Sequence, residues 1–160
     1  MFRRIDSLLA TLVLVALLIA AVAVRREPER LDGQPRVIDG DTLDLGGRRL
    51  RLAGLDAPEL GQTCERGGMP YRCGETARET LGELVRGGMV CTVSGRDKYR
   101  RDLARCEASG RDVGSVLVSR GVAVAYGRYE AEEQEARQRA LGLWAGRFER
   151  PSAWRSEHPR

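Results

Sequence analysis

Histidine and lysine are almost absent from this chain of 160 residues, which contains one of each. The histidine, His158, lies in a polar C-terminal tail, so a hydrolytic mechanism based on histidine is excluded unless that tail folds back. The sequence also lacks a Ser-His-Asp set, a glycine-rich phosphate loop, a metalloprotease motif and any internal repeat. Because there is no C-x-x-C pair with a nearby histidine, a zinc site is disfavoured as well.

The net charge gives little information about partners. The chain has 27 basic and 23 acidic residues, a net charge of +4, and residues 31–160 account for only about half of that excess. Almost all of the basic residues are arginines, which can simply reflect genomic base composition. A case for a binding partner must therefore come from where particular charges lie.

Long apolar runs are absent except at residues 8–24, where an uncharged stretch is preceded and followed by an arginine pair. A helix of that length spans about 25 Å, the short end of what crosses a membrane. The Ala21-Val22-Ala23 sequence also fits a signal peptide cleaved after Ala23. We expect residues 1–30 to form a hydrophobic signal-anchor (transmembrane) helix and a linker; the alternatives are a cleaved signal peptide and, less favoured, a buried core helix.

Four cysteines lie outside the apolar run, and an even number suits an oxidising compartment. Three pairings are possible. We favour Cys64–Cys73, which closes a short loop, and Cys91–Cys106, which would face each other across a symmetric hairpin. The domain is then expected outside the cytoplasm, either anchored in the inner membrane and facing the periplasm or exterior, or periplasmic or secreted after signal cleavage.

Residue patterns predict one mainly β domain with small helices, of the α+β class, over residues 31–150. Alternation and turn signals predict five strands, at 37–38, 42–45, 48–55, 90–93 and 102–106, and residues 122–126 form a further buried, strand-like run. Helical spacing predicts helices at 75–86, from Asp112 to Gly121, and at 130–144. Five strands with helices around them suggest a closed or partly open barrel of the OB type. Residues 151–160 are expected to be a polar, disordered tail.

Acidic residues cluster at the ends of two predicted strands. Asp41 lies in a turn between strands, while Asp56 and Glu59 flank Pro58 after another strand. Adjacent strands would bring these carboxylates together, and their repulsion requires a nearby cation. A hard divalent ion such as Ca²⁺ accepts carboxylate, carbonyl and water oxygens. The alternative is that these residues only supply turn chemistry.

Two arginines favour a site that binds phosphate. Arg51 precedes Asp56 by five residues, on the opposite pleat face unless the strand bends, and Arg101 follows a predicted turn. Guanidinium groups bind phosphate oxygens in a bidentate manner. Together with a metal ion and a carboxylate they could cleave a phosphodiester. Taken singly, each arginine is more typical of a solvated surface residue.

The same residues form three blocks, 38–42, Arg51 with 56–59, and 97–101, which resemble the staphylococcal nuclease (thermonuclease) family in order and spacing. Segments 121–126 and 141–144 look like the closing segments of that family. The resemblance covers nearly all of residues 34–144. It implies a five-stranded OB barrel and a Ca²⁺-dependent hydrolase that cleaves DNA and/or RNA. We expect the domain to be monomeric.

The resemblance also implies roles for individual residues. The Ca²⁺ ligands would be Asp41, Asp56 and the backbone carbonyl of Ala57. Glu59 would activate or orient the attacking water, and Arg51 and Arg101 would hold the scissile phosphate. Tyr99 and Tyr126 match aromatic positions of the nucleotide pocket, although Tyr126 could equally be an ordinary half-buried tyrosine.

Two departures from the family pattern bear on the rate of reaction. The family has threonine where Ala57 stands, but the expected ligand there is a main-chain oxygen. It has glycine where Arg100 stands, so a bulky cation could change the loop shape or add a phosphate contact. The main alternative function is a catalytically inactive OB-fold module that binds nucleic acid or a protein partner.

Overall fold

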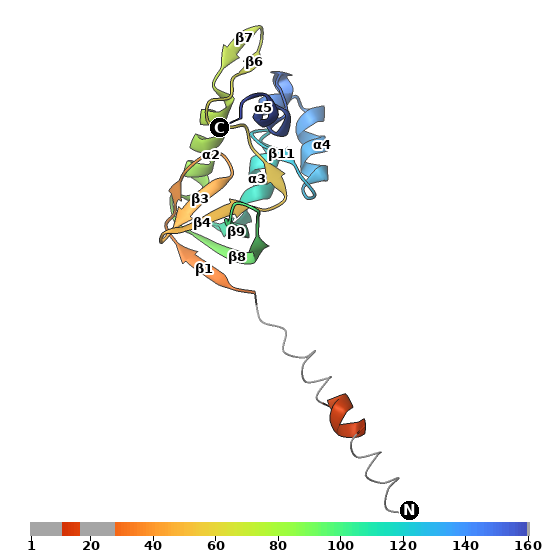
Figure 1. The fold of residues 1–160 in the computed structure, drawn as a ribbon. Coiled ribbons are helices and arrows are strands. Elements are labelled where there is room, and N and C mark those ends of the chain that lie inside the picture. The colour runs from red at the N-terminus through yellow and green to blue at the C-terminus, as the bar shows by residue number, and fades with distance from the viewer. Residues whose placement is uncertain (1–10, 17–27, 160) are drawn as a thin grey trace, which may run out of the picture.

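The computed structural model describes residues 11–16 and 28–159. Its largest sheet has seven strands, in the order β1-β8-β9-β4-β3-β2 with β10 beside β9, and it curls into a half-barrel (Figure 1). The predicted α+β class is confirmed, and the curled sheet is consistent with an OB-like fold. The expected count of five strands is not confirmed.

The elements follow one another along the chain with short connections. The large sheet contains β1 (Arg30–Gly33), β2 (Arg36–Val37), β3 (Thr42–Leu45), β4 (Arg48–Leu52), β8 (Met89–Arg96), β9 (Asp102–Ala108) and β10 (Arg111–Asp112). Two small sheets contain β5 (Leu55–Asp56) with β11 (Val124–Ala125), and β12 (Gly146–Arg147) with β6 (Cys64–Arg66) and β7 (Met69–Tyr71). The helices are α2 (Cys73–Val85), α3 (Val113–Ser119), α4 (Glu130–Gln138), the 3-10 helix η1 (Gly142–Ala145) and α5 (Pro151–Glu157).

The core lies between the inner face of the sheet and helices α2 and α3. Alternate strand residues such as Leu43, Leu50 and Leu52 are buried, as period-2 patterning requires. Helix α2 adds Ala77 and Leu81 at helical spacing. This core fixes the strands whose ends carry the acidic residues.

The predicted strand over 48–55 is interrupted, and this interruption shapes the site. Strand β4 ends at Leu52, and Gly54 adopts a left-handed backbone conformation with φ of 86°. The chain then enters β5, which pairs with β11 rather than with the large sheet. Strand β11 covers only residues 124–125 of the strand-like run predicted at 122–126.

Both predicted disulfides are confirmed. Cys91 and Cys106 face each other in the antiparallel β8–β9 register, and Cys64 is bonded to Cys73 at the start of α2. The first bridge ties the hairpin inside the core. The second fastens β6 to α2, close to the loop that carries Glu59.

The predicted helix at 75–86 is confirmed as α2, and the helix predicted from Asp112 is confirmed as α3. The Asp112 carboxylate accepts a hydrogen bond from the Ser115 N–H at 3.1 Å, so α3 begins where predicted. The predicted helix 130–144 is wrong beyond Gln138. There Ala140 and Gly142 take left-handed conformations with φ of 50° and 57°, which breaks the helix before η1.

The expected disorder of the C-terminal tail is wrong. Residues 151–157 form α5, which begins with a buried proline at its first position, where the missing N–H has no consequence for the helix. The Trp154 ring is partly buried and stacks on His158, with ring centroids 4.3 Å apart. The tail therefore folds back onto the domain, and the ring of His158 contacts Trp154 of α5, to whose carbonyl its Nδ1 is 3.0 Å away, rather than the acidic residues.

The predicted N-terminal apolar segment falls mostly outside the described residues. Residues 11–16 are helical and exposed, and the rest of the run, with the proposed cleavage position, is not described. Within the ranges 11–16 and 28–159, no helix is long and apolar enough to cross a bilayer.

Candidate active site

Asp41 is brought into the site by a tight turn before β3. Its carbonyl accepts a hydrogen bond from the Leu52 N–H at 2.9 Å, which ties the turn to β4. The preceding Gly40 lies against Ala57 and Ala77 so closely that an added Cβ would be 2.7 Å from the Cβ of each. Glycine at this position therefore allows the acidic turn to approach the end of β5 and helix α2.

The buried Asp41 carboxylate has three hydrogen-bond donors. Arg51 Nη1 donates to Oδ1 at 2.6 Å, the Thr42 hydroxyl donates to Oδ1 at 3.0 Å, and the Ala57 N–H donates to Oδ2 at 3.2 Å. These donors come from β4, β3 and the segment after β5. The carboxylate consequently has a fixed orientation.

Arg51 joins the two buried aspartates. It lies opposite Thr42 in the β3–β4 register, and its Nη2 donates to Asp56 Oδ1 at 2.8 Å. In one continuous strand, Arg51 and Asp56 would point to opposite faces of the sheet. The contact is possible because the chain bends at Gly54 between them. The Arg51 side chain is 17% exposed and the two carboxylates are 6% and 5% exposed.

Burial dominates the electrostatics of this pair. It raises the pKa of Asp41 from 3.8 to about 6, and the positive charge of Arg51 offsets only part of that effect. For Arg51, burial alone would lower the pKa, but the carboxylates of Asp41 and Asp56 raise it above its ordinary value. Arg51 therefore stays charged and is the fixed cation of the site.

Arg101 reaches the same network from the β8–β9 turn. Its Nε donates to Asp97 Oδ2 at 2.8 Å, and its Nη1 donates to the Thr42 hydroxyl at 3.2 Å. Arg100, at the family's glycine position, keeps a left-handed conformation with φ of 65°. The loop therefore retains a shape that glycine would favour, and Arg101 is oriented by Asp97.

The two tyrosines proposed for the nucleotide pocket are exposed. Tyr99 is 67% and Tyr126 is 73% exposed, so neither is an ordinary half-buried tyrosine. The Tyr99 ring lies 5.5 Å from the Arg101 guanidinium carbon and 5.0 Å from Lys98 Nζ. Tyr126 follows β11, and its N–H donates to the Gly54 carbonyl at 2.9 Å. No contact joins their rings directly to the aspartates among the described interactions.

Glu59 is positioned by a fully buried glutamine. The Glu59 N–H donates to Gln62 Oε1 at 3.2 Å, and Gln62 Nε2 donates to the Glu149 carbonyl at 2.6 Å. The same side chain thus connects the Glu59 loop to the segment that precedes α5. Neither this connection nor the identity of its partner was expected from the sequence.

Arg155 is a site residue that the sequence reasoning missed. From α5, its Nη1 and Nη2 donate to Asp56 Oδ1 and Oδ2, each at 3.0 Å, and its Nη1 also donates to Glu59 Oε1 at 3.1 Å. The proline at the first position of α5 and the tryptophan before Arg155 are signals that could have predicted a packed helix.

The five proposed groups therefore belong to one network. Asp41, Arg51 and Asp56 are in direct contact, whereas Arg101 joins through Thr42 and Glu59 joins through Arg155. Within the part of the chain that the structure describes, no three acidic, histidine or cysteine side chains converge in a metal-binding arrangement. In this structure Arg51 contacts both Asp41 and Asp56, and Arg155 contacts both Asp56 and Glu59.

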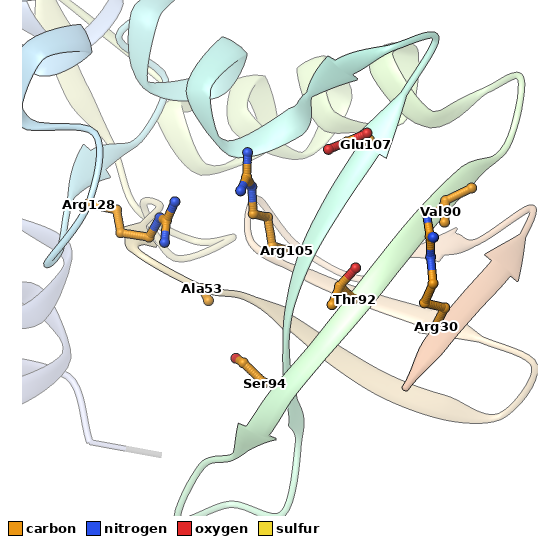
Figure 2. Close-up of a pocket in the computed structure, with 8 residues that line it drawn as sticks. All are labelled: Arg30, Ala53, Val90, Thr92, Ser94, Arg105, Glu107 and Arg128. Carbon is orange, nitrogen blue, oxygen red and sulfur yellow. The ribbon is translucent and has the colours of Figure 1, made fainter. Parts of the chain in front are cut away.

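A separate hollow of about 270 Å³ lies on the outer face of the sheet (Figure 2). Side chains of β8 and β9, including Thr92, Ser94 and Arg105, line it together with Arg30 and Arg128. The aspartates and Glu59 are not among its lining residues. Arg105 forms an ion pair with Asp112 at 2.7 Å. The hollow therefore lacks the group of acidic side chains and arginines that the candidate active site contains.

Comparison with known proteins places the chain in a family. Residues 49–146 match the model of the staphylococcal nuclease homologues. The chain is 36% identical to the succinoglycan biosynthesis protein ExoI of Rhizobium meliloti (strain 1021) over 152 residues, which covers 89% of this chain and 78% of that protein. It is 34% identical to a micrococcal nuclease of Shigella flexneri over 143 residues, covering 75% and 77% of the two chains.

A third relative is an uncharacterized endonuclease of Haemophilus influenzae (strain ATCC 51907 / DSM 11121 / KW20 / Rd), 28% identical over 94% of this chain and 85% of that protein. These matches agree with the acidic and arginine blocks found in the sequence. The chain belongs to the staphylococcal nuclease family.

Proposed function

We propose that the protein is a Ca²⁺-dependent nuclease that hydrolyses phosphodiester bonds of DNA and/or RNA. The observation that carries the proposal is the pair of buried aspartates bridged by Arg51, with Arg101 linked to the same pair through Thr42. Membership of the family and the nuclease names of two relatives support the reaction class.

The donors present fit a hard cation, provided that the guanidinium groups rearrange. Asp41 and Asp56 offer carboxylate oxygens and Ala57 offers a backbone carbonyl, which are ligands that Ca²⁺ accepts. When bound, the ion would polarise the phosphate and favour ionisation of a water molecule. The buried acids would also be compensated by its charge.

The remaining steps are assigned to residues of the chain. Arg51 and Arg101 would each donate to the oxygens of the scissile phosphate, and their interactions would strengthen as negative charge develops there. Glu59 would accept the proton of the attacking water or orient that water. Tyr99 and Tyr126 would stack against bases, for which their exposure makes them accessible.

A metal-dependence assay tests the proposal. Purified protein is mixed with single-stranded DNA or RNA in the presence of CaCl₂, or of chelator. We expect shortening of the nucleic acid only when Ca²⁺ is available. Binding without metal-dependent shortening would overturn the nuclease and support the inactive binding module.

We further propose that the domain functions outside the cytoplasm, anchored by the N-terminal apolar segment or released by its cleavage. The two disulfides of the described domain support an oxidising compartment. Alkylation of protein recovered from its native compartment should find no free thiols. Four reactive cysteines would contradict the proposed location.

A further inference from the structure

The contact between α5 and the acidic site brings a second guanidinium group to Asp56, which Arg51 already contacts. Arg155 grips Asp56 through both oxygens and also reaches Glu59. Hydrogen bonding to Asp56 raises the pKa of Arg155 above its ordinary value, so this group is always charged. The positive charge of Arg155 therefore lies against the carboxylates of Asp56 and Glu59, both of which belong to the proposed active site.

The contacts leave little room for a metal ion on Asp56. An ionised carboxylate has about four lone-pair positions. Arg51 uses one on Oδ1, and Arg155 uses one on each oxygen. A bound Ca²⁺ would lie close to the same oxygens and would be repelled by the nearby guanidinium. Arg155 and a metal ion are consequently alternative partners of Asp56.

Helix α5 is held to the domain mainly at its first residue, so the rest of the helix could move as a unit. Pro151 is buried and the buried Gln62 holds the Glu149 carbonyl, so the start of the helix is anchored. Beyond Pro151 most of the helix is exposed, and the Arg155 side chain is 40% exposed. The anchored start keeps the arginine near the site, while its exposed end allows it to leave.

We propose that α5 is an autoinhibitory latch, in which Arg155 occupies the cation position at Asp56 and Glu59 until a divalent ion displaces it. The inference depends on the proposed function for the identity of that ion. If the ion binds only when Arg155 has left Asp56, the closed state competes with the ion. The apparent affinity for Ca²⁺ then falls in proportion to the fraction of molecules in the closed state.

Calorimetric titration of the full-length chain with CaCl₂, without nucleic acid, tests the latch. The Arg155→Gln variant should bind Ca²⁺ about tenfold more tightly than the unchanged protein, equivalent to about 1.4 kcal/mol. The control is Arg139→Gln, which removes an exposed arginine paired with Glu135 in α4 and should leave the affinity unchanged. An unchanged or weaker affinity for Arg155→Gln would overturn the latch, and weaker binding would instead make Arg155 a positioning residue.

Amide hydrogen exchange provides a second readout in the unchanged protein. Adding CaCl₂ should speed exchange in residues 152–158 relative to the rest of the domain, because displacement of Arg155 releases the helix. Unchanged or slower exchange there would overturn the latch. Ca²⁺ binding without cleavage of nucleic acid would remove the proposed function alone, whereas Ca²⁺-dependent cleavage with unaltered binding by Arg155→Gln would remove the latch alone. Absence of Ca²⁺ binding in both proteins would overturn both.

Discussion

Arg51 and Arg155 both donate hydrogen bonds to Asp56, but they belong to very different parts of the fold. Arg51 projects from β4 inside the large sheet and is 17% exposed, whereas Arg155 projects from a seven-residue helix and is 40% exposed. Strand β4 is paired with β3 and with β9, so only the side chain of Arg51 can move away from Asp56. Removing Arg155 requires only that a peripheral helix lift away.

The comparison shows that two similar ion pairs can differ in permanence. The pair formed by an arginine of a central strand is part of the fold, whereas the pair formed by an arginine of a peripheral helix can be released. The sheet side of the site is fixed by backbone pairing and by the turn at Gly40. The helix side depends on a buried proline and one glutamine contact. The predictions below test this difference from the largest expected effect to the smallest.

The largest effect is expected on the sheet side. Arg51→Ala should lower kcat/KM by at least about 10²-fold, the scale of losing one donor to the transition state. It should also destabilise the fold, since two buried carboxylates lose their shared cation. Initial rates with Ca²⁺ and thermal unfolding measure the two effects. Arg49→Ala, at an exposed position of the same strand, is the control; a folded Arg51→Ala protein with a normal rate would contradict the assignment.

The buried acid on the sheet side should also make stability depend on pH. Because the pKa of Asp41 is raised from 3.8 to about 6 by burial, its contribution to stability is complete below pH 3.8 and is lost as pH rises through 6. In chelator, Asp41→Asn should escape this loss and gain about 3 kcal/mol relative to the unchanged protein between pH 4 and 7. Urea unfolding at several pH values measures the difference; parallel pH curves would refute the raised pKa.

A smaller effect is expected from crowding the acidic turn. Gly40→Ala forces a methyl group against Ala57 and Ala77, so it should lower the free energy of unfolding by about 2 kcal/mol. Gly82→Ala is the matched control, because a Cβ added at Gly82 would meet only a Val37 methyl group, at 4.0 Å. Chemical unfolding of both variants gives the comparison. Equal stability of the two would mean that the turn adjusts freely and that the sheet side is less rigid than we infer.

The smallest effect concerns the loop that presents Arg101. Arg100→Gly relieves a left-handed conformation but increases the freedom of the unfolded chain, so we expect a net stabilisation of about 0.5 kcal/mol. The cleavage rate should change little, since Asp97 continues to orient Arg101. A large loss of activity would show that Arg100 itself contacts the substrate.

The parts of the fold that were predictable are those with local signals. The Asp112 cap, the two disulfides and the meander of β2, β3 and β4 follow from capping, spacing and alternation. The blocks that carry the site were also recognisable. Strand pairing explains why these blocks lie close together.

The parts that were not predictable depend on long-range contacts or on backbone conformations that residue type does not reveal. The bend after Leu52 decides that Arg51 faces Asp56, and alternation alone cannot predict it. Ala140 in a left-handed conformation ended α4 without a glycine signal at that position. Arg155 was hidden because its partners lie 96 and 99 residues earlier in the chain.

The contact between Lys98 and Tyr99 has a practical consequence. Lys98 is the only lysine of the sequence, and it stands in the same turn as Arg101. An amine-reactive fluorophore would therefore label this chain at one side chain, apart from its terminal amine, and would do so beside the proposed substrate path. The protein thus carries its own attachment point for a dye whose emission could report the arrival of a nucleic-acid strand.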